Sequence, residues 1–262
     1  MPEIIINGPV GRLEGRYHLA PNLDAPVALI LHPHPLHGGS MNNKVTYLTY
    51  QAFAQKGFTV MRFNFRGVGR SEGVYDEGEG ELGDAATLLD WLQAFRPNAR
   101  SFWVSGFSFG AWIGMQLLMR RPEVRGFISI APPANMYDFS FLAPCPVSGM
   151  IVHGNRDDIV PPDSVKLLIE KLSKQRGITI SHNVIEGAGH FFKEHMLELN
   201  QQILSYLDGA DLREQEPFRY LEKKGIIHAP ETTDTEENLL DFDDLDDDEE
   251  EDEDDLKYAI ND

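Results

Sequence analysis

The stretch SFWVSGFSFGAWIGMQLLMRR, residues 101–121, decides the fold. It joins a short apolar run, predicted as a strand over Phe102–Val104, to a helical pattern over Phe109–Arg120. The junction Gly106-Phe107-Ser108-Phe109-Gly110 has the G-x-S-x-G spacing, in which glycines let two backbone segments approach closely at a tight strand-to-helix turn. We expect the hydroxyl of Ser108 to project from this turn as a nucleophile. The alternative is a serine that only caps the helix.

Strands and helices are predicted to alternate on both sides of this turn. Fully apolar runs such as VALIL and GMIV predict strands that are buried on both faces. An opening hairpin is predicted over Glu3–Ile6 and Leu13–Leu19, and further strands over Val27–Leu31, Thr59–Phe65, Gly126–Ile130, Gly149–Val152 and Ile178–Ile185. The other helices are predicted over Asn43–Lys56, Glu81–Phe95, Ser164–Gln175 and Phe192–Leu207. This order predicts the α/β class, with a mostly parallel twisted sheet and helices on both faces.

The distribution of charge divides the chain into a domain and a tail. The formal net charge is −19, but residues 231–262 contribute −17 of it and residues 1–230 only −2. We therefore expect one domain over residues 1–208, a linker over 209–230 that can form a short helix, and an acidic disordered tail over 231–262. The tail either solvates the protein or docks onto a basic protein partner. The nearly neutral domain offers no basic face for nucleic acid or for an anionic membrane.

Cysteine content and hydropathy bear on the location of the protein. Cys145 is the only cysteine, so no disulfide can form within the chain. No apolar run approaches the ~18 residues of a membrane span, and the first residues show no signal-peptide pattern. We expect a cytoplasmic protein in which Cys145 is a small buried residue.

A serine nucleophile needs a base beside it, and the base needs an acid that orients it. The loops that follow the strands of a parallel sheet meet at one edge of that sheet. His190 follows the strand predicted over Ile178–Ile185, and Asp157 and Asp158 follow the strand before it. We expect Ser108, His190 and Asp157 to act together, and we favour Asp157 over Asp158 as the acid.

These loops resemble those of the α/β-hydrolase superfamily. Gly106–Gly110 is similar to its nucleophile elbow, His153-Gly154-Asn155-Arg156-Asp157 to its acid loop, and Gly187-Ala188-Gly189-His190 to its histidine loop. Arg66-Gly67-Val68-Gly69-Arg70-Ser71 resembles a turn that is structural in that family. HPHPLHGGSMNNK, residues 32–44, is similar to a signature of small bacterial dienelactone-hydrolase-like enzymes without a cap domain. The resemblance covers about residues 1–208 and implies a serine esterase or thioesterase that needs no cofactor.

The segment HPHPLHGG, residues 32–39, is predicted as an oxyanion-hole loop because it follows an apolar strand at the same edge. Acyl transfer needs N–H donors aimed at the oxygen that gains negative charge. Among Pro33, His34 and Pro35 only His34 has a backbone N–H to donate. The second donor is expected to be the N–H of Phe109, directly after the nucleophile.

The three histidines of this segment also admit a metal interpretation. The spacing H-x-H-x-x-H resembles the first ligand motif of the zinc β-lactamase fold, but Leu36 stands where that motif requires aspartate. We expect no metal. His32 is expected to be a packed structural residue at the end of the strand, and His37 to line the mouth of the substrate pocket.

Residues 131–148, APPANMYDFSFLAPCPVS, are too few for a separate cap domain, so we expect an open cleft. Tyr137, Phe139 and Phe141 either form an apolar wall of this cleft or serve only in packing. The expected function is a serine hydrolase that cleaves small carboxylic esters, lactones or thioesters through an acyl-enzyme. The alternatives are a non-catalytic interaction protein that acts through its acidic tail, and an acyltransferase on the same scaffold.

Overall fold

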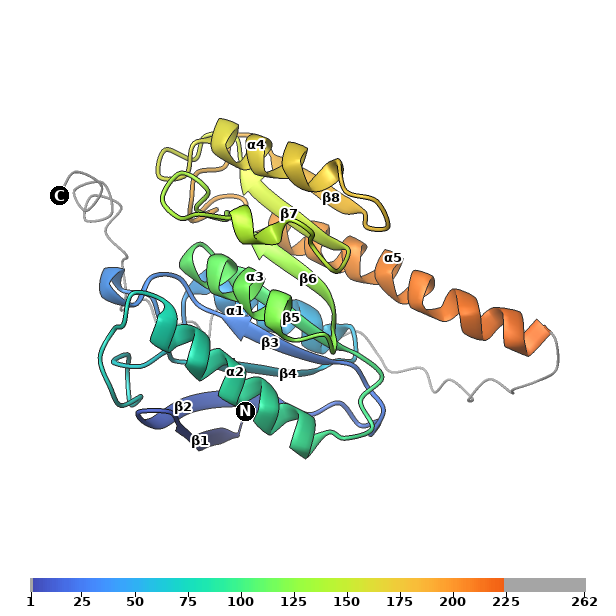
Figure 1. Ribbon diagram of the computed structural model, residues 1–262, viewed down its shortest axis with the longest axis horizontal. Helices are drawn as coiled ribbons and strands as arrows, with labels where there is room; N and C mark the ends of the chain where they lie inside the picture. The colour runs from blue at the N-terminus through green and yellow to red at the C-terminus, as the bar shows by residue number, and fades with distance from the viewer. Residues whose placement is uncertain (1, 224–262) are drawn as a thin grey trace.

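The computed structural model describes residues 2–223, with side chains for residues 2–210. Eight strands of this part form one sheet in the order β1-β2-β4-β3-β5-β6-β7-β8 (Figure 1). The strands are β1 Glu3–Gly8, β2 Gly11–His18, β3 Val27–Leu31, β4 Thr59–Phe63, β5 Phe102–Phe107, β6 Val124–Ile130, β7 Gly149–Gly154 and β8 Ile180–Ile185. β2 pairs antiparallel with β1 and β4, and β4, β3, β5, β6, β7 and β8 run parallel. The carboxyl ends of these parallel strands therefore meet at one edge of the sheet.

The α-helices cover both faces of the sheet. In Figure 1, α2, α3 and α4 lie in front of it, and α1 and α5 lie behind it. Their bounds are α1 Lys44–Gln55, α2 Glu79–Phe95, α3 Phe109–Arg120, α4 Pro162–Ser173 and α5 Met196–Lys223, with short 3-10 helices η1 Pro35–His37 and η2 Ser140–Leu142. The predicted α/β class and its layers are confirmed.

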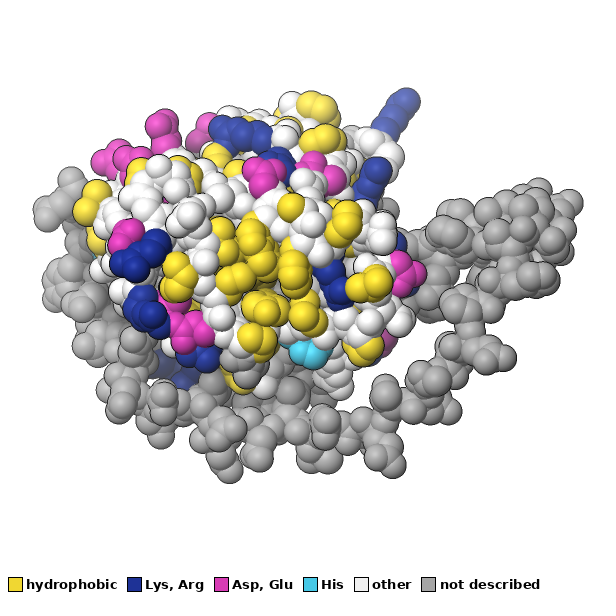
Figure 2. Space-filling view, turned by 90° about the horizontal axis from the view of Figure 1, so that it is seen from below, with side chains coloured by type: hydrophobic (Ala, Val, Ile, Leu, Met, Phe, Trp, Pro, Cys, Tyr) yellow, Lys and Arg dark blue, Asp and Glu magenta, His cyan; other side chains and the backbone are white. Residues whose placement is uncertain are grey.

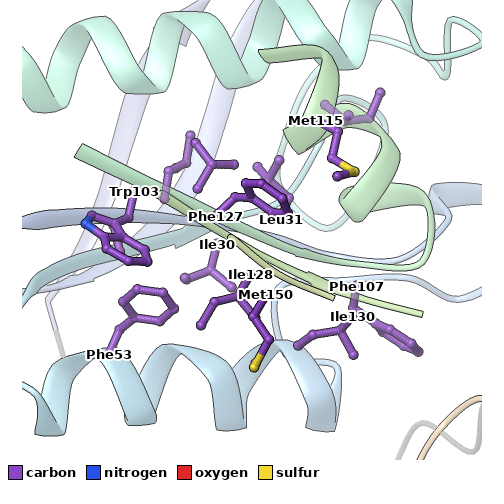
Figure 3. Close-up of a cluster of buried hydrophobic side chains, with 14 of the residues drawn as sticks. Ile30, Leu31, Phe53, Trp103, Phe107, Met115, Phe127, Ile128, Ile130 and Met150 are labelled. Atoms are coloured by element: carbon purple, nitrogen blue, oxygen red, sulfur yellow. The ribbon is translucent and has the colours of Figure 1, made fainter. Parts of the chain in front are cut away.

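The core lies on both sides of the central strands, as their continuous apolar runs predict. Every residue of β3, β4, β5 and β7 is buried. Figure 3 shows Leu31 and Phe127 on the side of the sheet where Met115 projects from α3, and Ile30 on the side where Phe53 projects from α1. Because side chains alternate along a strand, two neighbouring apolar residues pack on opposite faces of the sheet.

The last helix differs most from its prediction. α5 begins at Met196 instead of Phe192, because Phe192 has a φ of 55° and turns the chain before the helix can start. It continues to Lys223, past the predicted end at Leu207 and into the predicted linker over 209–230. The reason is local, since Ala, Leu, Arg, Glu and Gln, all good helix formers, dominate residues 210–216. The acidic tail predicted over 231–262 lies outside the described residues.

The R-G-x-G-x-S turn after β4 has the structural role that the resemblance implies. The guanidinium of Arg66 donates hydrogen bonds of 2.9 and 2.7 Å to the two carboxylate oxygens of Asp84 on α2, and both residues are buried. The hydroxyl of Ser71 donates to the carbonyl of Asn64 at 2.7 Å. The two glycines have φ values of 76° and 55°, which favour glycine. The turn thus ties the end of β4 to α2.

The surface near β1 and β2 carries apolar side chains. Figure 2 views the molecule from the side of these strands and shows hydrophobic side chains gathered near the centre of this face. Ile5 of β1 and Phe95 at the end of α2 are exposed, and the ring of Phe95 stacks on Trp91 at 4.6 Å between ring centroids. Among residues 2–223, no helix combines the length and the apolar character that crossing a membrane requires.

Candidate active site

Ser108 lies at a strained turn between β5 and α3. Its φ of 51° and ψ of −118° are unusual for a residue with a side chain. A Cβ on Gly106 would lie 2.2 Å from the carbonyl oxygen of Gly110, and a Cβ on Gly110 would lie 2.4 Å from that of Leu31. Only glycine fits at either position, so both glycines of the motif hold the turn against its neighbours. The backbone N–H of Ser108 also donates to the carbonyl of Ile130 at 2.9 Å, which anchors the turn to β6.

His190 meets Ser108 across the carboxyl edge of the sheet. Its Nε2 lies 3.0 Å from Oγ of Ser108, and its Nδ1 lies 2.8 Å from Oδ2 of Asp157. A carboxylate only accepts hydrogen bonds, so Nδ1 carries the proton and Nε2 accepts from the serine hydroxyl. The ring is 97% buried, and it packs beside Phe107 at 5.1 Å and Phe191 at 5.2 Å between ring centroids. These contacts fix the orientation of the imidazole.

Asp157, not Asp158, faces the histidine. Its Oδ1 accepts the backbone N–H groups of Ile159 at 3.0 Å and Val160 at 2.7 Å, which leaves Oδ2 for His190. Its side chain is fully buried, whereas Asp158 is exposed. The structure therefore brings together the three side chains Ser108, His190 and Asp157 that the sequence singles out.

The acid loop and the histidine loop are packed directly against each other. The backbone N–H of Arg156 donates to the carbonyl of Ala188 at 2.9 Å, and that of Gly187 donates to the side-chain oxygen of Asn155 at 2.7 Å. A Cβ on Gly154 would lie 2.1 Å from the carbonyl oxygen of Ala188. The distance between Asp157 and His190 is thus set by backbone contacts between two adjacent strand ends.

The two backbone N–H groups predicted for the oxyanion hole are available. Neither that of His34 nor that of Phe109 donates a hydrogen bond to any described residue. Phe109 is the first residue of α3, where an N–H has no partner inside the helix. The imidazole ring of His34 lies 5.0 Å from the ring of Phe109 between centroids, so the two segments are in contact beside Ser108.

The other histidines of the HPHPLHGG loop do not form a metal cluster. Nδ1 of His32 lies 2.7 Å from the carbonyl of Pro33, and its Nε2 accepts the backbone N–H of Phe65 at 3.0 Å. Burial lowers the pKa of His32 to about 3, so the ring is neutral. His37 is half-buried, with its ring 4.5 Å from that of His34 between centroids. Among residues 2–223, no three histidine, cysteine, aspartate or glutamate side chains are grouped to hold a metal ion.

Of the three aromatic residues predicted for the pocket wall, the structure brings one close to the turn of Ser108. The ring of Tyr137 lies 6.0 Å from that of Phe109 between centroids. Phe139 is 92% buried in the hydrophobic core, and Phe141 stacks on it at 6.0 Å. Phe139 and Phe141 thus take the packing alternative, whereas Tyr137 lies beside the residue that follows the nucleophile.

Tyr75 and Trp112 join this site although the sequence did not single them out. The ring of Tyr75 lies 4.9 Å from that of His34, and Trp112 stacks on Tyr137 at 4.2 Å, between centroids. Burial raises the pKa of the Tyr75 hydroxyl and that of the Tyr137 hydroxyl. We call His34, Tyr75, Phe109, Trp112 and Tyr137 the aromatic cluster. A signal for Tyr75 existed, because its loop follows β4 at the carboxyl edge of the sheet.

Comparisons with known proteins show to which family the chain belongs. The model of the X-Pro dipeptidyl-peptidase (S15) family matches residues 17–146, which include Ser108 but end before Asp157 and His190. An uncharacterised protein of Rickettsia prowazekii is 54% identical over 211 residues, which are 79% of this chain and 89% of that protein.

Two solved structures extend the comparison. A protein of unknown function from Agrobacterium tumefaciens, described as a candidate α/β hydrolase, is 56% identical with a TM-score of 0.78 and covers 79% of this chain and 95% of its own. An α/β serine hydrolase without a lid from Xanthomonas campestris is 34% identical with a TM-score of 0.70 and covers 77% of this chain and 91% of its own. The chain therefore belongs to the α/β-hydrolase superfamily, among its serine hydrolases without a lid.

Proposed function

We propose that this protein is a serine esterase that cleaves small carboxylic esters, lactones or thioesters through an acyl-enzyme. The observation that supports this most is the continuous chain of hydrogen bonds from Ser108 through His190 to Asp157, at 3.0 and 2.8 Å. A hydroxyl is a poor nucleophile at neutral pH unless a base removes its proton. In this arrangement Nε2 of His190 is that base.

In the first half of the reaction, Oγ of Ser108 attacks the carbonyl carbon while its proton moves to Nε2 of His190. Asp157 keeps the proton on Nδ1 and stabilises the imidazolium that forms. The carbonyl oxygen gains negative charge and accepts the N–H groups of His34 and Phe109, which have no competing partner among the described residues. The tetrahedral intermediate then collapses, and His190 gives its proton to the leaving alkoxide or thiolate.

In the second half, water replaces the leaving group. His190 takes a proton from the water molecule as the water oxygen attacks the acyl carbon of the ester on Ser108. The same two N–H groups hold the oxyanion, and the proton returns from His190 to Oγ of Ser108 as the acid product leaves. The groups named here complete the cycle without a cofactor. We further propose that the enzyme works in the cytoplasm, in keeping with its single cysteine.

Hydrolysis of p-nitrophenyl acetate tests the proposal. We expect turnover by the wild-type protein and a loss of at least about 10⁴-fold in kcat for Ser108→Ala, because the attacking oxygen is gone. Ser140→Ala is the matched control, since Ser140 is an exposed serine at the start of η2, between β6 and β7, and should keep wild-type turnover. Equal turnover by wild type and Ser108→Ala, or none by wild type, would overturn the proposal.

The S15 family match raises peptide hydrolysis as a second activity to measure. That family model ends at residue 146, so it does not reach the acid and histidine loops. We expect the wild-type protein to hydrolyse p-nitrophenyl acetate and to leave glycyl-prolyl-p-nitroanilide intact. Faster cleavage of the dipeptide anilide than of the ester would replace the esterase proposal with a peptidase.

A further inference from the structure

We infer that three exposed apolar side chains form a binding site for the apolar chain of the substrate, so the enzyme prefers esters whose acyl group extends beyond the pocket. These residues are Leu36, Val74 and Met136, with 66%, 77% and 38% of their surface exposed. We call them the apolar rim. This inference rests on the proposed function and adds the class of substrate to it.

The rim residues come from different loops, which meet at the edge of the sheet that carries Ser108. Leu36 lies in η1 after β3, Val74 in the loop between β4 and α2, and Met136 in the loop between β6 and β7. Each is one or two positions along the chain from a ring of the aromatic cluster. Leu36 follows His34 by two residues, Val74 precedes Tyr75 and Met136 precedes Tyr137.

Contacts within the aromatic cluster hold these loops together. The rings of His34 and Tyr75 lie 4.9 Å apart between centroids, which joins the first loop to the second. Phe109 joins the second loop to the third, because its ring lies 6.0 Å from those of Tyr75 and Tyr137 between centroids. Phe109 contacts the rings of all three at 5.0 to 6.0 Å, and it directly follows Ser108 in the chain. The loops that carry the rim are therefore held beside the nucleophile.

The charge around the rim favours an uncharged ligand. The segments 32–39, 71–80 and 131–142 contain no lysine or arginine, but they contain Glu77, Glu79 and Asp138, and also Glu72 and Asp76, which pair with Arg12 and Arg66. Such a border repels an anionic membrane surface and attracts no acidic protein. An uncharged hydrocarbon chain is not repelled by these carboxylates, and its binding removes apolar surface of both the chain and the rim from water. Release of the product is also favoured, because the carboxylate of the freed acid is repelled.

The experiment measures kcat/KM for p-nitrophenyl acetate, butyrate and octanoate, each below the concentration at which the ester forms micelles. We expect the wild-type protein to prefer octanoate to acetate. The variants Leu36→Ser, Val74→Ser and Met136→Ser should each lower the octanoate-to-acetate ratio by about threefold to fivefold, mainly through KM, because each removes part of the apolar contact. Leu23→Ser is the matched control, since Leu23 is 68% exposed in the loop before β3 at the opposite edge and should keep the wild-type ratio.

Other results would overturn the inference in distinguishable ways. If the wild-type protein hydrolyses acetate but the rim variants keep the wild-type ratio, the rim does not bind substrate and the esterase proposal stands. If octanoate hydrolysis responds to the rim only when neutral phosphatidylcholine vesicles are present, the rim docks onto lipid instead. If no ester in the series is hydrolysed, the proposed function and the inference fail together.

Discussion

Replacing His34 by proline should remove one oxyanion donor with little change elsewhere. His34 has a φ of −59° and a ψ of 124°, which are values that proline adopts and that a residue before Pro35 prefers. Its N–H donates to no described residue, so the folded protein loses no hydrogen bond with it. The variant His34→Pro does lose the imidazole ring, which contacts Tyr75 and Phe109. His34→Ala is therefore the matched control, because it loses the ring and keeps the N–H.

The comparison between these two variants isolates a single donor. Removing one such donor from an oxyanion hole typically lowers kcat by about 10²- to 10³-fold, or roughly 2.7–4 kcal/mol of transition-state stabilisation. We expect kcat for p-nitrophenyl acetate to be lower by that factor in His34→Pro than in His34→Ala, while their thermal unfolding midpoints agree within a few degrees. If the two variants turn over within threefold of each other, the His34 amide does not hold the oxyanion.

Three further predictions concern the acid, the core and pH. Asp157→Asn should lower kcat by about 10⁴-fold. The side-chain oxygen of the asparagine would keep the hydrogen bonds from the two backbone N–H groups, so its NH₂ group would face the imidazole and favour the wrong tautomer of His190. Asp158→Asn, the control, should leave kcat within twofold of the wild-type value. Asp84→Ala should lower the free energy of unfolding by about 3–5 kcal/mol in urea titrations, because it leaves the buried guanidinium of Arg66 with only the exposed carboxylate of Asp76 at 3.5 Å. Asp76→Ala should cost less than about 1 kcal/mol, because its carboxylate is exposed. The folded pKa of His32 is about 3, so below pH 6.5 the unfolded chain binds more protons at this residue than the folded chain does, and the free energy of unfolding should decrease as the pH is lowered. Between pH 6.5 and 4.5 this residue should account for a decrease of about 2–3 kcal/mol. The variant His32→Gln should lack that part of the pH dependence.

The central part of the site could be predicted from the sequence because short-range patterns determine it. Gly106 and Gly110 are required because a Cβ at either position would lie only 2.2 or 2.4 Å from a backbone oxygen, and such a strand-to-helix turn appears in the sequence as a fixed spacing. Asp157 and His190 each follow a strand of a parallel sheet, so the topology alone brings them to the same edge. The two prolines around His34 leave one N–H in their segment, which is why the sequence predicts His34 as a donor.

The rest of the site depends on contacts that no local pattern contains. The loop of Tyr75 could be assigned to the carboxyl edge because it follows β4, but the sequence beyond the R-G-x-G-x-S turn does not indicate that this loop folds back onto His34. Phe139 and Tyr137 are both aromatic and lie two residues apart, yet one enters the core and the other faces the turn of Ser108. The extension of α5 from Leu207 to Lys223 was missed because the predicted domain ended at residue 208, although good helix formers continue beyond it.

Labelling by a fluorophosphonate probe, followed by mapping of the modified peptide, tests the central claim most directly. The probe forms a stable bond only with a serine whose hydroxyl a neighbouring base activates. We predict a single label on Ser108 in the wild-type protein and a loss of labelling in His190→Gln, whose side chain cannot take the proton from Oγ. A label on any other serine, or equally fast labelling of Ser108 when His190 is replaced, would contradict the account.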